Sequence, residues 1–299
     1  MTILLFGKTG QVGWELQRSL APLGPVVALD TRSTDYCGDF TQLQGLADTV
    51  RAIQPRLIVN AAAHTAVDKA ESEETLARQI NALAPGVLAR EAQALGAWLV
   101  HYSTDYVFNG SGTQPWVETD DTGPLSAYGR TKLEGEQAIQ ASGCQHLIFR
   151  TSWVYAARGG NFAKTMLRLG RERADLTVID DQMGAPTGAD LIADITAHAV
   201  RQAMQQPELA GIYHLVAAGE TSWHGYARFV LNKARERGIE LAVTDDRIKP
   251  VPTSAFPTPA KRPSNSRLCT DKLRAAFQLH LPSWEHGVTR MLDEILDTH

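Results

Sequence analysis

The chain has 299 residues, of which 43% are hydrophobic and 21% charged, enough to bury a large core as one domain or as two parts sharing an interface. A formal net charge of −4, with no long block of Lys or Arg, argues against a nucleic-acid partner. No apolar run approaches the ~18 residues that a membrane helix needs, so no membrane partner is expected. The three cysteines are widely separated and lack a C-x-x-C spacing, which favours a reducing cytoplasm over a disulfide framework or a zinc site.

The first half of the chain alternates short apolar runs with amphipathic segments. The apolar runs predict strands at Ile3–Phe6, Val26–Leu29, Leu57–Asn60, Trp98–Tyr102 and Leu147–Phe149. The amphipathic segments predict helices at Val12–Leu23, Thr41–Ile53, Glu74–Leu95 and Ala127–Gln140. This alternation predicts an α/β domain over residues 1–150, with a mostly parallel sheet covered on both faces by helices.

After about Arg150 the alternation of apolar runs and amphipathic segments is less regular. Residues 151–299 predict a smaller α/β part, some segments of which return to the first sheet. Helices are predicted at Phe162–Arg173, Thr187–Gln205, Trp223–Arg237 and Trp284–Leu296, and strands at Leu176–Ile179 and Gly211–Leu215. The stretch from Lys249 to Pro263 holds five prolines. It is either a flexible linker or an ordered loop, and the helical pattern that follows it favours the loop.

Gly7, Gly10 and Gly13 recur every third residue where the first strand passes into the first helix. In that context the first glycine permits a tight turn, the second lets backbone approach a pyrophosphate, and the third lets helix and strand pack closely. The helix N-terminus then offers free N–H groups and a favourable dipole to the phosphates. A glycine turn without a ligand is the alternative, and the strand-turn-helix context favours dinucleotide binding. The sequence therefore predicts a Rossmann-type doubly wound sheet.

Asp30 ends the second strand, within ~20 residues of the glycine turn, where an acidic residue usually binds the adenosine ribose hydroxyls. This position favours NADH. Arg32 stands two residues further on and is able to accommodate the extra phosphate of NADPH. Both cofactors remain open at this stage.

Tyr128 and Lys132 are four residues apart in a predicted helix, so both side chains lie on one face. A tyrosine with its ordinary pKa of ~10 is a poor acid or base near neutrality, and a nearby ammonium lowers that pKa. The pair is suited to passing a proton to a carbonyl oxygen as hydride reaches the carbon. Tyr-x-x-x-Lys is common by chance, and it becomes specific only together with the glycine turn.

Thr104 and Asp105 follow the fourth strand and should lie at the carboxyl edge of the sheet, where open α/β folds bind their ligands. Thr104 is predicted to orient a substrate carbonyl toward Tyr128, and the alternative is a simple strand-end cap. His101, within the strand, is interpreted as a structural residue.

These motifs resemble an extended short-chain dehydrogenase/reductase, and the whole chain resembles the dTDP-4-dehydrorhamnose reductase family. The matching stretches are Gly7–Gly13, Asn60–Asp68, Ser103–Phe108, Tyr128–Lys132, Arg150–Tyr155, Asn161–Phe162, Asp181–Thr187 and Arg262–Ser266. The resemblance implies NAD(P)H-dependent reduction of the 4-keto group of dTDP-4-dehydro-β-L-rhamnose to dTDP-β-L-rhamnose. That step makes an activated sugar for cell-surface polysaccharide.

The resemblance also implies roles for individual residues. Gly10, Gln11 and Val12 would line the pyrophosphate, and Asp30 the ribose. The adenine would be flanked by Asp39 and Phe40, and the cofactor would be lined further on by Ala62, Ala63, His64 and Thr65. Tyr128 would be the proton donor, with Lys132 holding the nicotinamide ribose and tuning Tyr128. Thr104, Asp105 and Trp153 would touch the sugar.

Three residues of the second half are candidate contacts for a dTDP-sugar. Trp153 could stack against a sugar or thymine ring, although core packing is the usual role of a tryptophan. Arg262 could pair with the diphosphate, since a guanidinium fork suits phosphate oxygens, and a plain surface role is about equally plausible. Asn265 could add a polar contact.

Some relatives are described as pairing through a metal ion. By that resemblance Glu15, Asp190 and Glu294 are candidate ligands for Mg²⁺, which prefers oxygen, in a homodimer. Ordinary solvated carboxylates are an equally good interpretation. Nucleotide-sugar dehydratases usually carry Thr-Asp-Glu where this chain has Thr104-Asp105-Tyr106, which argues against water elimination. A non-catalytic regulatory subunit of the same fold and a nucleotide-sugar epimerase are the remaining alternatives.

Overall fold

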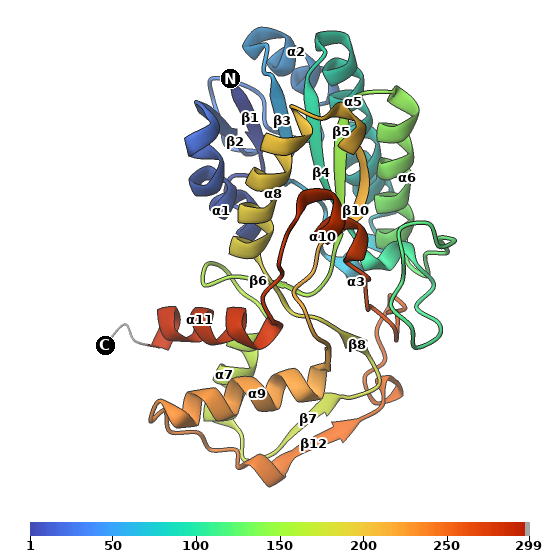
Figure 1. The fold of residues 1–299 in the computed structure, drawn as a ribbon. Coiled ribbons are helices and arrows are strands. Elements are labelled where there is room, and N and C mark those ends of the chain that lie inside the picture. The colour runs from blue at the N-terminus through green and yellow to red at the C-terminus, as the bar shows by residue number, and fades with distance from the viewer. Residues whose placement is uncertain (297–299) are drawn as a thin grey trace.

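A computed structural model describes residues 1–296 of the chain. Its centre is a six-stranded parallel sheet with the order β10-β5-β4-β3-β1-β2 (Figure 1). The strands are β1 (Ile3–Phe6), β2 (Val26–Leu29), β3 (Leu57–Asn60), β4 (Trp98–Thr104), β5 (His146–Thr151) and β10 (Gly211–His214). The predicted doubly wound α/β sheet is confirmed, and β10 shows that the second half of the chain contributes its edge.

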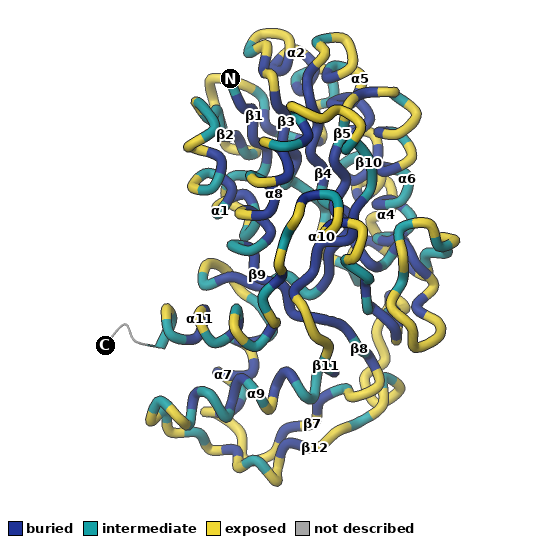
Figure 2. The backbone as a smooth tube through the Cα atoms, viewed as in Figure 1, coloured by how far each residue is buried: buried dark blue, intermediate teal, exposed yellow. Residues whose placement is uncertain are grey.

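Alternate residues of the strands enter two separate cores. Ile3 and Leu5 of β1 face the core that contains α1 and α8, whereas Leu4 and Phe6 face the core that contains α2, α5 and α6. Both faces are thus apolar, which is why the strands read as continuous apolar runs. Figure 2 shows the buried backbone running along these strands, with exposed segments on the outer loops.

Helices follow the predicted positions closely, with one exception. The helices around the sheet are α1 (Gln11–Leu20), α2 (Leu43–Ile53), α3 (Val67–Ala70), α4 (Glu74–Arg78), α5 (Ala84–Leu95), α6 (Ala127–Ser142), α8 (Ala189–Ala203) and α10 (Asp271–Phe277). The single helix expected over Glu74–Leu95 is interrupted by a π-helical turn at Gln79–Leu83. Pro85 has no N–H for the carbonyl four residues before it, Asn81, and this opens the helix there.

The remaining elements form a second, smaller core. It contains α7 (Phe162–Glu172), α9 (Trp223–Glu236) and α11 (Trp284–Leu296), which pack beside the parallel pair β7 (Leu176–Ile179) and β12 (Ile248–Val251). Four two-residue strands connect these parts: β6 (Val154–Tyr155), β8 (Met183–Gly184), β9 (Thr187–Gly188) and β11 (Thr221–Ser222). This part lies beyond the carboxyl edge of the main sheet (Figure 1).

The proline-rich stretch is ordered, as expected, and it begins inside β12, which the sequence did not predict. Thr253 N donates to Asp181, and Arg262 forms an ion pair with Asp68 of α3 at 2.7 Å. Both contacts tie the loop to other elements. Within residues 1–296, no helix has the length and apolar character required to cross a membrane.

Candidate active site

The glycine turn joins β1 to α1 at the point where the sheet order reverses, between β1 and β3. Gly7 has φ +86°, and a Cβ there would lie 2.7 Å from the backbone of Ala61. A Cβ on Gly13 would lie 2.0 Å from the Gly7 carbonyl oxygen. Both glycines are therefore required by close backbone contacts within the protein itself.

The N-terminus of α1 is open. Gly10 is its exposed N-cap residue, and no side chain caps the helix. Buried polar atoms without a protein partner lie nearby, including Gln11 Oε1 at the helix start and His64 Nδ1 after β3. Free N–H groups, a helix dipole and unpaired polar atoms fit a dinucleotide pyrophosphate bound between these segments.

Asp30 follows β2, and its carboxylate accepts a hydrogen bond from Arg32 N at 3.0 Å. Lys8 lies beside it, with Nζ 3.9 Å from Asp30 and 3.2 Å from Ser33 Oγ. Sequence reasoning singled out Asp30 and Arg32 and missed Lys8. The acid suits ribose hydroxyls, whereas the two cations suit an additional phosphate.

Asp39 and Phe40 have different surroundings from those expected. The Asp39 carboxylate accepts hydrogen bonds from Thr41 and Gln42, and the Thr41 backbone N–H is the main cause of its lowered pKa. Phe40 is 3% exposed and packs edge-on against Phe6 at 5.5 Å. The Phe40 ring therefore belongs to the core, and its place beside the adenine stays a prediction.

The loop after β3 holds the four residues predicted to line the cofactor: Ala62, Ala63, His64 and Thr65. Two buried asparagines that the sequence analysis did not single out hold this loop in place. Asn60 Oδ1 accepts from Ala62 N at 3.0 Å, and Asn81 Oδ1 accepts from His64 N at 2.8 Å. Asn81 lies in the π-helical turn, so the interruption of the helix serves to anchor the loop.

Tyr128 lies in the first turn of α6, behind the N-cap Ser126, whose Oγ accepts from Gly129 N at 3.2 Å. Tyr128 lies beside Thr104 at the end of β4. Burial raises the pKa of Tyr128 to about 12, Thr104 opposes that rise, and the Asp105 charge adds to it. The structure thus places a neutral phenol and a threonine hydroxyl together at the carboxyl edge of the sheet.

Lys132 is 2% exposed, and its Nζ donates to the Tyr102 carbonyl at 2.6 Å and contacts His101 Nε2 at 3.2 Å. Burial lowers the pKa of Lys132 to about 8, and Glu136 opposes this effect. The tuning of Tyr128 by Lys132 stays a prediction. The four-residue spacing gives both residues one face, but the lysine amine turns toward β4.

Asp105 is buried beside Thr104, whose Oγ1 donates to Asp105 Oδ1 at 2.9 Å. Burial raises the pKa of Asp105 to about 6, against hydrogen bonds from Ser266 and Thr104. Ser266 comes from the segment after the proline-rich stretch, so two distant parts of the chain meet at this carboxyl.

A cavity of about 250 Å³ adjoins these residues. Trp153, Phe162, Trp223 and Arg262 are among its lining residues, and so is Tyr106, whose ring lies edge-on to Tyr128 at 5.5 Å. Trp153 stacks on Trp223 with 3.7 Å between ring centroids. This aromatic pair offers an apolar wall to a planar ligand.

Two residues of the Asp181–Thr187 motif hold the tryptophan pair. Trp223 Nε1 donates to Gln182 Oε1 at 3.0 Å. A Cβ on Gly184 would lie 2.8 Å from the Trp153 indole, so the glycine leaves room for that ring. The motif thus acts by positioning the cavity wall.

Arg262 and Asn265 differ in whether their polar groups face the cavity or bind other protein groups. The Arg262 guanidinium lines the cavity while it is held by Asp68. Asn265 is 1% exposed; its Nδ2 donates to the Gln114 carbonyl at 2.8 Å, and its Oδ1 accepts from Arg267. Both ends of the Asn265 amide bind protein groups and anchor the loop, and the substrate contact of Asn265 stays a prediction.

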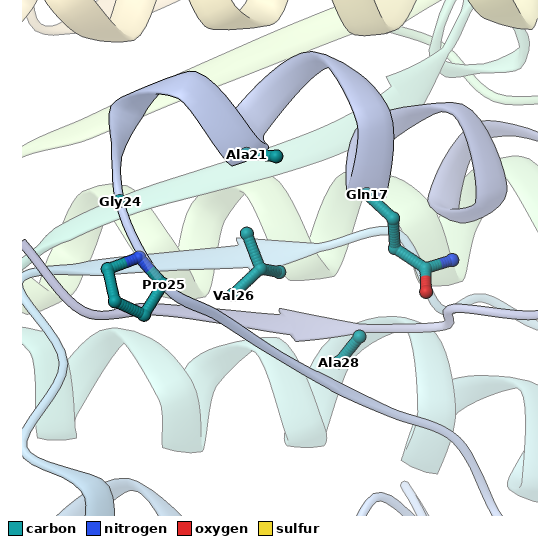
Figure 3. A pocket seen from close by; sticks show the side chains of 6 residues that line it. All are labelled: Gln17, Ala21, Gly24, Pro25, Val26 and Ala28. Carbon is teal, nitrogen blue, oxygen red and sulfur yellow. The ribbon is translucent and has the colours of Figure 1, made fainter.

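A second hollow, of about 540 Å³, lies between α1 and the edge strand β2 (Figure 3). The lining residues are Gln17, Ala21, Gly24, Pro25, Val26 and Ala28. None of them carries an acid, a base or a nucleophile, and we assign this hollow no chemistry.

The predicted magnesium ligands do not form a site within one chain. Across residues 1–296, no three His, Cys, Asp or Glu side chains are grouped to hold a metal ion. Glu15 pairs with Arg18 at 3.5 Å, Asp190 pairs with Arg290, and Glu294 is exposed. Two of the three carboxylates, Glu15 and Asp190, are thus paired with arginines of their own chain.

A parallel doubly wound sheet, an open glycine turn and a Tyr-x-x-x-Lys helix beside a strand-end threonine define a short-chain dehydrogenase/reductase. The RmlD substrate binding domain family matches residues 1–296. The dTDP-4-dehydrorhamnose reductases of Shigella flexneri and Salmonella typhimurium are 61% and 62% identical over 298 residues, covering 100% of this chain and 99% of each relative. The chain belongs to the dTDP-4-dehydrorhamnose reductase family, and the prediction of an enzyme of dTDP-rhamnose biosynthesis is confirmed.

Comparison with solved structures agrees with this family assignment. A dTDP-4-dehydrorhamnose reductase from Clostridium acetobutylicum superimposes with a TM-score of 0.87 at 36% identity, covering 99% of this chain and 100% of that one. One from Bacillus anthracis, in complex with NADP, gives 0.86 at 34% identity, with 98% and 99% covered. A Thermus thermophilus UDP-glucose 4-epimerase, at 18% identity over 100% of both chains and a TM-score of 0.78, shares the fold.

Proposed function

We propose that this chain reduces the 4-keto group of dTDP-4-dehydro-β-L-rhamnose, with Tyr128 donating the proton to the carbonyl oxygen. The observation that carries this assignment is the close approach of Tyr128 and Thr104 at the carboxyl edge of the sheet, where Thr104 opposes the rise in the pKa of Tyr128. The phenol supplies one donor for the carbonyl oxygen, and the Thr104 hydroxyl, which donates to Asp105 in this structure, would supply a second on turning to the substrate. The raised pKa of Tyr128 keeps the phenol protonated near neutral pH, which is the state that donates.

NADPH or NADH supplies the hydride when bound. Gly10, Gln11 and Val12 would hold its pyrophosphate, Asp30 and Asp39 its adenosine end, and the Ala62–Thr65 loop the stretch beyond β3. Lys132 would hold the nicotinamide ribose. The NADP in the Bacillus anthracis relative supports NADPH, and so does Lys8 beside Asp30.

The dTDP-sugar would enter the aromatic cavity between the two parts of the chain. The stacked pair of Trp153 and Trp223 suits a planar base, and Arg262 suits the diphosphate. Asp105 would accept from a sugar hydroxyl. In this arrangement residues 1–150 bind mainly the cofactor, and residues 151–299 mainly the substrate.

The same proposal includes a cytoplasmic location, in line with the three free cysteines. A homodimer also stays a prediction. Sedimentation velocity with and without EDTA would test both the dimer and any magnesium link between copies, because a metal-bridged dimer would dissociate on chelation.

The activity is tested by following NADPH absorbance with dTDP-4-keto sugar freshly made by a dehydratase. We expect net, stoichiometric loss of NADPH and formation of dTDP-β-L-rhamnose. An epimerase returns the hydride and would show no net loss. Absence of NADPH consumption with a folded protein would overturn the proposal.

A further inference from the structure

A buried chain of hydrogen bonds runs from β3 through β4 to α6. Asn60 Nδ2 lies 3.0 Å from His101 Nδ1, and His101 Nε2 lies 3.2 Å from Lys132 Nζ. Lys132 Nζ also donates to the Tyr102 carbonyl at 2.6 Å. The three side chains are 1%, 1% and 2% exposed, so each contact must be satisfied within the protein.

The orientation of Asn60 fixes the tautomer of His101. Asn60 Oδ1 accepts the backbone N–H of Ala62 at 3.0 Å, which leaves the Nδ2 donor facing His101. His101 Nδ1 must therefore be the acceptor. Burial lowers the pKa of His101 well below its ordinary value, so the ring is neutral and its one proton sits on Nε2.

This tautomer points an N–H at Lys132 Nζ. An ammonium has three donors and no acceptor, so it cannot accept that hydrogen bond. A free amine has a lone pair that accepts from His101 while one of its own N–H groups donates to the Tyr102 carbonyl. The contacts around Nζ are thus satisfied by the free amine and not by the ammonium.

We propose that His101, locked as the Nε2–H tautomer by Asn60, is a positioning residue that holds the free-amine form of Lys132 against β4 and releases the ammonium form toward Tyr128 and the cofactor site. The proposal rests on the proposed function only in assigning Lys132 to the active site. The proposed contact couples the charge of Lys132 to the position of its amine. Because the pKa of this lysine is lowered to about 8, the charge changes within the pH range in which activity can be measured.

The other charged groups on the elements packed around Lys132 have partners of their own or act elsewhere. Glu136, one turn along α6, raises the pKa of Lys132, and it is itself paired with Arg150 of β5 at 2.7 Å. Asp105 acts on Tyr128. The charges of α4, Glu74 and Arg78, pair with Arg130 and Glu134 of α6, and Glu91 of α5 pairs with Arg51 of α2. His101 is therefore the neighbouring side chain that contacts Nζ within the described residues.

The tautomer is read directly from nitrogen shifts of ¹⁵N-histidine-labelled protein. We expect His101 to be neutral with its proton on Nε2, and its shift to follow a titration near pH 8 that is absent in Lys132→Met. His146 is the internal reference for the opposite tautomer, since its Nδ1 donates to the Cys144 carbonyl at 2.8 Å. A proton on His101 Nδ1, or an imidazolium at pH 7, would overturn the proposal.

Two variants test the effect on Lys132. In Asn60→Asp the carboxylate accepts from both Ala62 N and His101 Nδ1–H, which reverses the tautomer and presents an acceptor to the ammonium. In His101→Leu the donor is removed while burial is kept. In both, the alkaline limb of log kcat/KM should move up by about one pH unit.

His214→Leu, at an equally buried histidine in β10, should leave the limb in place. Should Asn60→Asp fail to fold, His101→Leu and the nitrogen shifts of the unmodified enzyme decide. An unmoved alkaline limb in folded His101→Leu protein refutes the proposal even where NADPH is still consumed, so its failure is distinct from failure of the proposed function.

Discussion

Tyr128 reaches Thr104 because the next residue in α6 has no side chain. A Cβ on Gly129 would lie 2.3 Å from the Tyr106 carbonyl oxygen, so α6 can approach the segment after β4 only with glycine there. The side-chain contact that supports the reaction thus depends on a backbone contact beside it.

Tyr128→Phe removes the proton donor and keeps the ring that packs on Tyr106. General acid catalysis contributes ~10²–10⁴-fold, so kcat should fall by about that much, with NADPH affinity little changed. Steady-state kinetics and cofactor fluorescence measure the two quantities. Tyr213→Phe, in β10, is the matched control and should retain activity. Near-normal turnover of Tyr128→Phe would show that another group is the acid.

Asp105 makes the stability of the fold depend on pH. Its pKa is raised to about 6 in the folded state from an ordinary 3.8, so the folded state binds the proton more tightly. The stabilisation is full below pH 3.8 and is lost as pH rises through 6. The free energy of unfolding of Asp105→Asn, measured by urea unfolding relative to the parent chain, should therefore rise by roughly 2 kcal/mol from pH 4 to pH 7.5. An equal difference at both pH values would contradict this.

The turn between β1 and α1 shows two separate uses of glycine within one element. Gly7 and Gly13 are required by contacts inside the protein, whereas a Cβ on Gly10 would meet only the Gly7 carbonyl oxygen at 3.4 Å, an ordinary contact. Gly10 is exposed at the open helix end. Its lack of a side chain is consistent with close approach of a ligand rather than with packing.

Gly10→Ala and Gly13→Ala should therefore behave differently. Gly10→Ala should fold with a nearly unchanged Tm and bind NADPH about tenfold more weakly, a loss of ~1.4 kcal/mol. Gly13→Ala should lose about 1–3 kcal/mol of stability through overpacking. Thermal unfolding and fluorescence titration distinguish them. Unchanged NADPH affinity in Gly10→Ala would move the cofactor away from this turn.

At the scale of the whole molecule, the active site is assembled from both parts of the chain. Tyr106 of the cavity follows β4, Trp153 and Trp223 come from the second part, and Arg262 comes from the proline-rich stretch. The ion pair between Arg262 and Asp68 of α3 fastens that loop across the site.

Asp68→Asn tests this link without altering a lining residue. The half-exposed pair is worth up to about 1 kcal/mol, so KM for the dTDP-sugar should rise up to about fivefold. The affinity for NADPH should not change. Glu220→Gln, which breaks the exposed Arg267–Glu220 pair elsewhere, is the control. An increase in KM that is equal in both variants would indicate a general loss of order rather than a specific link.

The sequence by itself determined the sheet, most helices and the glycine turn, because local periodicity and spacing along one element fix which face a side chain occupies. Only the tertiary structure decided the direction of Lys132, the burial of Phe40 and Asn265, the contact of Asn81 with His64 and the His101 contact. Each of these depends on atoms more than 16 residues apart in the chain competing for one donor, acceptor or volume, and spacing in a sequence carries no record of that competition.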